Sequence, residues 1–435
     1  MKLGFKYGGW SIAALIGLVL LCATACGTPV VAPEFLTGGE SETVTGPVAA
    51  IATESAPIVL EGGNVLDGAV EAYDPDVDYF PDKVSPRYAE GFEVAYHPNY
   101  KVVTVLTPWR EADVTFRYVL VQRGTPVPED VGDAQVIEVP VETVASLATT
   151  HLPYLDELGL VDRLTGVGGF AYINTPSVVE KIETGGIIEV GRNADVNVEL
   201  MLDLDPELVT TLGLGMSSKD NHPQLLAAGF DVALVSDFME TTPLGRAEWI
   251  KFMALFFNRE AAAEEIFAAK AARYEALAAL AQDVAERPEV FMGFEIRGTW
   301  YMPGGGGYLA RYLEDAGATY LWAGDDSNGK IPLDFETVYE RAAEAPYWVN
   351  LSQSWTNVDD VLAADERYGD FEALKRGGAY NHNALLNEGG GNDYNESGHA
   401  NPDLILSDLI KIFHPDLLPE HELRYYRHLV PASEP

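Results

Sequence analysis

The residues best suited to hold a ligand are aromatic and basic side chains that follow predicted strands. An α/β sheet binds ligands at the carboxyl ends of its strands, where a pocket needs apolar area and a few fixed polar groups. Aromatic rings supply that area at a small cost in conformational entropy, and arginine or histidine supplies directed polar contacts. These residue types favour non-covalent binding of a large, flat or greasy molecule. The candidates are His151, Tyr172, Arg297, Trp300, Tyr301, Trp355 and His382.

Each candidate also has an alternative that the sequence leaves open. An aromatic residue at a strand end can equally belong to the core, and Arg297 can form an internal ion pair in so acidic a chain. Trp300 and Tyr301 are neighbours, so on a strand they point to opposite faces. His151 and His382 facing each other across a cleft would suggest a bare-metal site. Such a site needs three or four ligands, and no compact set is present, so we expect no metal held by side chains alone.

A polar, glycine-rich segment, NEGGGNDYNESG (387–398), follows a predicted strand. Its side-chain oxygens could bind calcium, although their spacing does not match an EF-hand loop. The alternatives are a loop that lines the ligand cleft and a plain surface loop. The oxygens belong to Glu388, Asn392, Asp393 and Glu396.

Enzymatic motifs are not evident. The run GGGG (304–307) lacks the Lys-Ser/Thr that follows a nucleotide-binding loop, so we interpret it as a sharp turn beside the ligand. No GxSxG, HExxH or Ser/His/Asp order stands out. With 67 acidic residues a pair of carboxylates is always available, so such a pair does not indicate a glycosidase. We therefore expect no catalytic residues.

Composition narrows the class of protein. The 435 residues include 28 Lys and Arg against 67 Asp and Glu, a formal net charge of -39. So negative a surface repels phosphate backbones, which argues against nucleic-acid binding. Cys22 and Cys26 are the two cysteines, so the rest of the chain has no disulfide, CxxC redox centre or cysteine-ligated zinc.

The N-terminus is typical of an export signal. Lys2 and Lys6 precede a short apolar run, Ser11 to Leu21, which is too short to span a bilayer. The sequence ATACG (23–27) resembles a bacterial lipobox, which predicts a lipoprotein signal peptide over 1–25 and lipid on Cys26. Ordinary signal-peptidase cleavage after Ala25 is the alternative. We expect an extracytoplasmic protein that is lipid-anchored to the cell membrane.

The rest of the chain divides by its patterns. Residues 26–75 are rich in Gly, Pro and Thr, which predicts a flexible tether, and alternating strands predict a β-strand extension over 76–140. Beyond it, strands and helices alternate in two similar halves, 141–242 and 288–435. Between the halves, 243–287 has no Gly or Pro after Gly245, which predicts connecting helices, the last one long. The fold class is therefore α/β, with two Rossmann-like lobes bridged by a long helix.

Three features together resemble the iron-chelate and vitamin B12 type of periplasmic substrate-binding proteins of ABC importers. They are the strand–loop–helix VETVASLATTHLPYLDELGLVDRLTGVGG, the element VNVELMLDLDPELV and the helix that joins the halves. The resemblance covers residues 140–430. It implies a helical-backbone fold without enzymatic activity, in which the lobes clamp a ligand and deliver it to a permease.

The resemblance also implies the ligand class and the partners. We expect a monomer without a cofactor that captures a metal chelate, such as a ferric siderophore, or a corrinoid. Such proteins dock on the ABC permease through one acidic residue on each lobe, which we assign to Glu157 and Glu314. A bare transition-metal binding protein of the same fold is the alternative, and an exported hydrolase is a more distant one.

Overall fold

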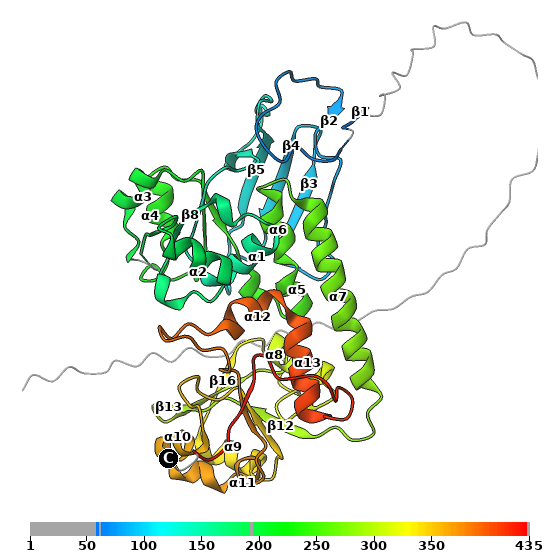
Figure 1. Ribbon diagram of the computed structural model, residues 1–435, viewed down its shortest axis with the longest axis vertical. Coiled ribbons are helices and arrows are strands. Elements are labelled where there is room, and N and C mark those ends of the chain that lie inside the picture. Colours follow the sequence, from blue (N-terminus) through cyan, green and yellow to red (C-terminus); the bar gives the residue numbers. More distant parts are fainter. Residues whose placement is uncertain (1–57, 61, 192–194, 433–435) are drawn as a thin grey trace, which may run out of the picture. The chain divides into compact units, whose positions relative to one another are not determined.

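The computed structural model describes residues 58–60, 62–191 and 195–432. The predicted signal peptide and Cys26 lie outside the described residues. Within that part of the chain, no helix combines the length and apolar character needed to cross a membrane. Its elements form two α/β lobes, an N-terminal sheet and a set of connecting helices (Figure 1).

Lobe 1 is built on five parallel strands in the order β11-β10-β7-β8-β9. Every residue of β7, β10 and β11 is buried, as expected for short apolar strands covered on both faces. Helix α3 ends where Asp205 adopts a left-handed conformation (φ 46°) before Pro206. The elements are β7 (Val144–Ser146), α1 (Leu152–Glu157), β8 (Leu164–Val167), α2 (Pro176–Glu183), β9 (Ile188–Glu189), α3 (Val198–Leu204), β10 (Leu208–Thr211), α4 (His222–Ala227) and β11 (Val232–Leu234).

Lobe 2 repeats this topology. Its main sheet has the order β15-β12-β17-β18-β19 and is parallel except for the last pair. The order β8-β7-β10-β11 in lobe 1 thus corresponds to β15-β12-β17-β18 in lobe 2, and the predicted internal repeat is confirmed. The strands are β12 (Glu289–Met292), β15 (Thr319–Tyr320), β17 (Tyr347–Val349), β18 (Ala379–Asn381) and β19 (Arg427–His428).

Lobe 2 also carries a small antiparallel sheet and more helices than lobe 1. The sheet consists of β13 (Glu295–Ile296), β14 (Thr299–Pro303) and β16 (Lys330–Leu333), in that order. Arg297 and Gly298 form the turn between β13 and β14, both with positive φ. The helices are α8 (Tyr308–Asp315), α9 (Phe335–Ala342), α10 (Val358–Ala364), α11 (Glu372–Lys375), α12 (Ser397–Ala400) and α13 (Pro402–Phe413).

Three connecting helices join the lobes: α5 (Pro243–Ala247), α6 (Trp249–Leu255) and α7 (Glu260–Gln282). Figure 1 shows α7 as one uninterrupted helix that runs from the N-terminal sheet toward lobe 2. It buries Phe267, Ala271 and Tyr274 on one face and packs on α6, α8 and α13. The predicted α/β class with two lobes and a bridging helix is confirmed.

The N-terminal addition is a four-stranded sheet: β3 (Phe92–Tyr96), β4 (Tyr100–Val105), β5 (Phe116–Gln122) and β6 (Gln135–Val139). Strands β3, β4 and β5 pair antiparallel, whereas β5 and β6 pair in parallel because the chain between them crosses back to the same end. Two short strands, β1 (Ile58–Val59) and β2 (Val77–Asp78), pair beside it.

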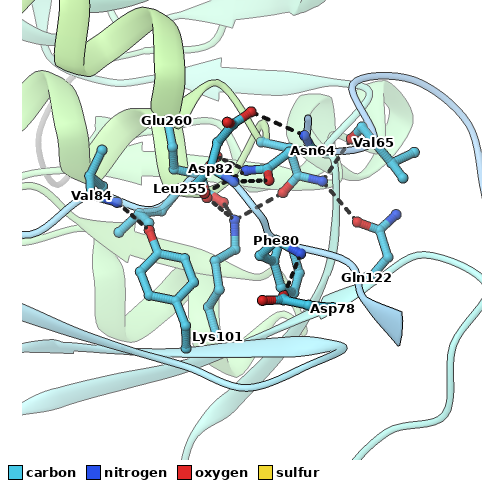
Figure 2. A network of polar contacts seen from close by, with 12 residues as sticks. Asn64, Val65, Asp78, Phe80, Asp82, Val84, Lys101, Gln122, Leu255 and Glu260 are labelled. Atoms are coloured by element: carbon cyan, nitrogen blue, oxygen red, sulfur yellow. Dashed lines mark hydrogen bonds and ion pairs between the residues drawn. The ribbon is translucent and has the colours of Figure 1, made fainter. Parts of the chain in front are cut away.

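A buried polar network fastens this sheet to the connecting helices (Figure 2). Lys101 Nζ on β4 donates to Glu260 Oε1 (2.7 Å), to Asn258 Oδ1 (2.9 Å) and to the Leu255 carbonyl (2.6 Å). Asn64 Nδ2 donates to the other oxygen of Glu260 at 2.9 Å. The predicted tether over 26–75 is therefore wrong for its last part, because Asn64 is buried in a network that fixes the chain around it.

Candidate functional site

A pocket of about 190 Å³ lies at the carboxyl ends of three neighbouring parallel strands of lobe 2. Gly293 follows β12, Asn350 follows β17 and His382 follows β18. The small sheet supplies another wall, through Tyr301 of β14 and Lys330 of β16. The lining residues are Met292, Gly293, Phe294, Ile296, Tyr301, Pro303, Tyr308, Leu309, Lys330, Asn350, Leu351, His382, Tyr394 and Asn395.

The walls of this pocket combine aromatic area with a few polar groups. Tyr301, Tyr308, Tyr394 and Phe294 give four rings, and Lys330 adds an exposed cation that forms no ion pair among the described residues. Asn350 has a left-handed backbone (φ 56°), and its Oδ1 accepts a hydrogen bond from Tyr426 Oη at 2.7 Å. Apolar walls with a few convergent polar groups are typical of small-molecule sites.

His382 is a neutral member of the pocket. Its ring packs edge-on against Tyr394, with centroids 4.9 Å apart, and burial lowers the pKa of the imidazole to about 4. Its Nδ1 is buried without a hydrogen-bond partner in the described structure. The side chain is therefore suited to one directed hydrogen bond and not to carrying charge at neutral pH.

Lobe 1 has a smaller hollow in the corresponding place. It measures about 140 Å³ and lies at the carboxyl ends of β7, β8 and β10. Backbone and small side chains form most of its wall, which runs from Ser146 to Thr150, includes Gly168 and Gly169, and reaches Ile173 and Leu212. Tyr172 belongs to the loop beside it and is 38% exposed.

The segment predicted as a calcium site or cleft loop lies between these two pockets. Leu386 and Asn392 pair as a bridge, so residues 383–393 form a hairpin, which we call the cleft hairpin. Asn395, just after it, lines the lobe 2 pocket, whereas Asn387 Nδ2 donates to the carbonyl of Ile173 in the lobe 1 pocket (3.1 Å). Tyr394 and Asn395 of this segment thus line the lobe 2 pocket, and Asn387 contacts a wall residue of the lobe 1 pocket.

Three of the four residues proposed for calcium, Asn392, Asp393 and Glu396, accept hydrogen bonds from the protein. Glu396 accepts from the backbone nitrogens of Asn174 (2.9 Å) and Thr175 (2.8 Å), and Asp393 accepts from Ser397 Oγ (2.7 Å). Glu396 is buried, which raises the pKa of its carboxyl group. Across the described residues no group of three His, Cys, Asp or Glu side chains is arranged to hold a metal ion.

Both tryptophans predicted to contact the ligand belong to the core. Trp300 is 0% exposed, donates through Nε1 to the Met292 carbonyl (2.9 Å) and packs among Phe291, Trp348 and Phe371. Its neighbour Tyr301 points the other way on β14 and is 40% exposed. Trp355 is 9% exposed and packs between Phe294 and Tyr368. The prediction that both indoles face the ligand is therefore wrong.

His151 is also an internal residue. Its ring is fully buried, with Nδ1 3.1 Å from Thr210 Oγ1, and it does not line the lobe 1 pocket. Burial lowers the pKa of this imidazole to about 3, so the ring is neutral. The prediction of His151 as a ligand contact fails because its helix turns the ring into the lobe.

Arg297 occupies a different position from the one expected of a cleft residue. It forms the exposed tip of the β13–β14 turn, next to Ile296, which lines the lobe 2 pocket. Within the described residues it forms no ion pair, so the internal-pair alternative does not hold. Arg297 lies beside the pocket rather than inside it.

The two predicted docking acids differ in accessibility. Glu157 is bound to Lys270 Nζ of α7 at 2.6 Å and reaches Asn401, so it joins lobe 1 to α7 and α12 from the inside. This internal role contradicts its assignment as a docking residue. Glu314 is largely exposed, 3.5 Å from Arg311, and remains available to a partner.

Several pocket residues escaped the sequence prediction. Tyr308 begins α8, Lys330 begins β16, and Tyr394 lies in the polar segment. Asn350 directly follows β17, and its place at a strand end was the available signal. Larger hollows of about 420 and 510 Å³ lie along α7, and helices and residues 83–88 form most of their walls. A hollow of about 520 Å³ lies beside α8 and is lined by Gly305–Gly307, by β15 and by neighbouring loop residues.

The sequence matches a family model described as periplasmic binding protein over residues 144–382. Two uncharacterized lipoproteins of Methanocaldococcus jannaschii are 28% and 22% identical over 357 and 325 residues. The alignments cover 78% and 71% of this chain, and 85% and 75% of the two relatives.

Solved structures share the fold. A periplasmic binding protein from Veillonella parvula superposes with a TM-score of 0.51 at 14% identity, covering 72% of this chain and 98% of that one. A possible iron-binding (periplasmic solute-binding) protein from Staphylococcus epidermidis gives 0.50 at 16%, covering 63% and 99%. Helicobacter pylori CeuE with Ni(II) bound gives 0.50 at 18%, covering 66% and 88%. The superpositions include 88–99% of these three structures but only 63–72% of this chain. Most of the residues that this chain has in addition therefore lie outside the shared fold.

Proposed function

Because this chain belongs to the periplasmic binding protein family, we propose that it is an extracytoplasmic solute-binding lipoprotein that captures a ligand between its lobes and delivers it to the permease of an ABC importer. The observation that carries the proposal is the aromatic lobe 2 pocket at the carboxyl ends of β12, β17 and β18. An α/β sheet binds ligands at that edge, and a second strand-end pocket occupies the corresponding place in lobe 1.

The ligand class that suits this pocket is an organic metal chelate or a corrinoid. Four rings supply contact area, whereas Lys330 and His382 supply few directed polar contacts. A volume of about 190 Å³ is below the roughly 300–1,000 Å³ of a typical ligand site, so this pocket holds one part of the ligand. The remainder would lie in the cleft, near Tyr172 and Arg297. A similar fold in the Staphylococcus epidermidis protein, described as possibly iron-binding, agrees with this class.

The anchor and the docking surface complete the proposal. Lipid on Cys26 would hold the protein at the cell membrane, and both Methanocaldococcus jannaschii relatives are named lipoproteins. Glu314, exposed at the end of α8, is the acid of lobe 2 that would contact the permease. Glu157 is half-buried and paired with Lys270, which leaves the docking residue of lobe 1 unassigned.

Native mass spectrometry of protein purified from its own host tests the proposal directly, because a bound chelate or corrinoid adds a defined mass. Tryptophan quenching by a ferric trihydroxamate chelate and by cobinamide then gives affinities for wild type and Tyr301→Ala. We expect one of these probes to bind and the variant to bind about tenfold or more weakly. Tight binding of free nickel or zinc, with no binding of any chelate, would favour the bare-metal alternative.

A further inference from the structure

The cleft hairpin crosses from one pocket to the other. Its base is buried beside the lobe 2 pocket, where Asn392 Nδ2 donates to the His382 carbonyl (3.1 Å) and Ala384 N donates to the Tyr425 carbonyl (3.1 Å). Its tip, residues 387–391, reaches the lobe 1 loop at Ala171–Ile173. The hairpin thus divides the space that a ligand bridging both lobes would occupy.

Two glycines allow the tip to rest on lobe 1. A Cβ on Gly389 would lie 2.0 Å from the Ala171 carbonyl oxygen, and a Cβ on Gly391 would lie 2.2 Å from that of Tyr172. Backbone oxygens cannot yield as a flexible side chain does, so any larger residue would force the tip away. Neither glycine has a positive φ, so contact and not backbone conformation requires them.

The tip is held less firmly than the surface on which it rests. Glu396 fixes the lobe 1 loop through Asn174 and Thr175 and is itself buried. The tip instead forms its turn from its own hydrogen bonds, from Asn387 N to the Gly391 carbonyl and from Gly391 N to Asn387 Oδ1. It can therefore leave lobe 1 as an intact turn, at the cost of the Asn387–Ile173 hydrogen bond and the glycine contacts.

We propose that the tip of the cleft hairpin is a gate that closes the ligand cleft and swings off lobe 1 when a ligand fills it. This inference rests on the proposed function, because it assumes a ligand that reaches from the lobe 2 pocket toward lobe 1. It makes Gly389 and Gly391 residues that control ligand entry and release. Both lie after residue 382, where the match to the family model ends.

Glycine substitutions test the gate because an added Cβ should hold the tip away from lobe 1. Gly389→Ala and Gly391→Ala should each raise the association and dissociation rates of a ferric trihydroxamate chelate about tenfold, measured by stopped-flow tryptophan quenching. Gly324→Ala is the matched control, because a Cβ there meets nothing within 4 Å and its φ is not positive. Rates unchanged in both tip variants would overturn the gate.

Asn387→Asp tests the same gate without adding a Cβ at the tip. The variant keeps the Oδ1 that accepts from Gly391 N, but it replaces the amide that donates to the Ile173 carbonyl by a carboxylate oxygen, which that carbonyl repels. The tip should therefore leave lobe 1 more easily, and chelate exchange should be about tenfold faster than in the wild type. Amide hydrogen exchange at residues 387–391 should also rise in this variant, whereas Glu388→Gln, at an exposed position of the tip, should change neither.

The outcomes separate the two proposals. A wild type that binds no chelate or corrinoid contradicts the proposed ligand class, and the gate is then judged by hydrogen exchange of the tip alone. Equal protection of residues 387–391 in the wild type and in Asn387→Asp shows that the tip is not held on lobe 1, which overturns the gate. Equal chelate exchange rates in the wild type, the two glycine variants and Asn387→Asp also overturn it, even when the wild type binds its chelate tightly.

Discussion

The carboxylate of Glu396 in lobe 2 accepts a hydrogen bond from the backbone nitrogen of Thr175 at 2.8 Å. Thr175 directly precedes helix α2 of lobe 1, so the two lobes meet at the N-terminus of this helix. This contact joins the lobes in addition to α7 and to the hydrogen bonds Asn401–Glu157 and Asn387–Ile173. Acceptors of this kind satisfy N–H groups that a helix leaves unpaired at its first turn. The lobes are thus joined through the ligand side of the molecule as well as through its connecting helices.

Removing this carboxylate should destabilise the protein. Glu396→Ala leaves the buried donors of Asn174 and Thr175 without an acceptor, and we expect a loss of about 2–4 kcal/mol in the free energy of unfolding. Urea denaturation measures the loss. Glu388→Ala, at an exposed position of the tip, is the control, and equal stability of the two variants would show that the contact is not formed.

Adjacent residues of β14 should separate stability from binding. Trp300→Ala opens a cavity in the core of lobe 2 and should cost about 3–5 kcal/mol in the free energy of unfolding. Tyr301→Ala removes an exposed ring and should leave that free energy within about 0.5 kcal/mol of wild type. Thermal melts and urea titrations report both, and a reversed order would mean that the strand presents its other face to the core.

The arrangement of two lobes joined by helices could be predicted from the sequence, because helix starts and ends depend on neighbouring residues in the chain. The stretch after Gly245 carries no Gly or Pro, and it folds into α6 and α7. The dipeptide Asp205-Pro206 follows α3 directly, as a helix-ending signal should. The residues of the site were harder to predict. Alternation shows that Trp300 and Tyr301 face opposite ways, but the packing of Phe371 and Trp348, far along the chain, decides which of them is buried.

Distant partners explain the other errors. Thr210, the partner of His151, is 59 residues away along the chain, and Lys270, the partner of Glu157, is 113 residues away. No local sequence pattern therefore predicts that the side chains of His151 and Glu157 point into the protein. The sequence marks 387–398 as polar and glycine-rich, and only the fold shows that Gly389 and Gly391 lie against the backbone of Ala171 and Tyr172. The sequence alone singled out residues 387–398 as a candidate site segment. The contacts of this segment with both lobes are tertiary, so they could not be predicted.

The buried pair of Lys101 and Glu260 should anchor the N-terminal sheet. Both side chains are 0% exposed, so Lys101→Met leaves a carboxylate buried without its cation, at an expected cost of about 3–5 kcal/mol. Lys83→Met, which breaks a pair whose lysine side chain is 46% exposed, should cost about 1 kcal/mol or less. If chemical denaturation gives both variants the same midpoint, the network in Figure 2 does not stabilise the fold as described.

His151 should make stability depend on pH. Its pKa is about 3 in the folded protein and about 6.5 in the unfolded chain, so between these values the unfolded chain binds the extra proton. Stability from this group is therefore complete above about pH 6.5 and falls by up to about 1.4 kcal/mol per unit as the pH drops toward 3. His151→Gln should flatten this part of the profile between pH 6.5 and 4, measured by urea denaturation; parallel profiles would contradict the assignment.

Lipid on Cys26 should decide where the protein is found in the cell. Cys26→Ala removes the acceptor, so the variant should move from the membrane fraction to the soluble fraction after lysis, as detected by immunoblot. Cys22→Ala is the matched control and should remain with the membranes. A Cys26→Ala protein that stays in the membrane fraction would contradict the anchor.

The most direct test of the account is the affinity of the co-purified ligand for wild type and for Tyr301→Ala, measured side by side by fluorescence titration. If the lobe 2 pocket holds the ligand, losing this ring weakens binding about tenfold or more while the melting temperature stays the same. An unchanged dissociation constant in a folded Tyr301→Ala variant would contradict the account, because the ligand would then bind somewhere other than the pocket at the ends of β12, β17 and β18.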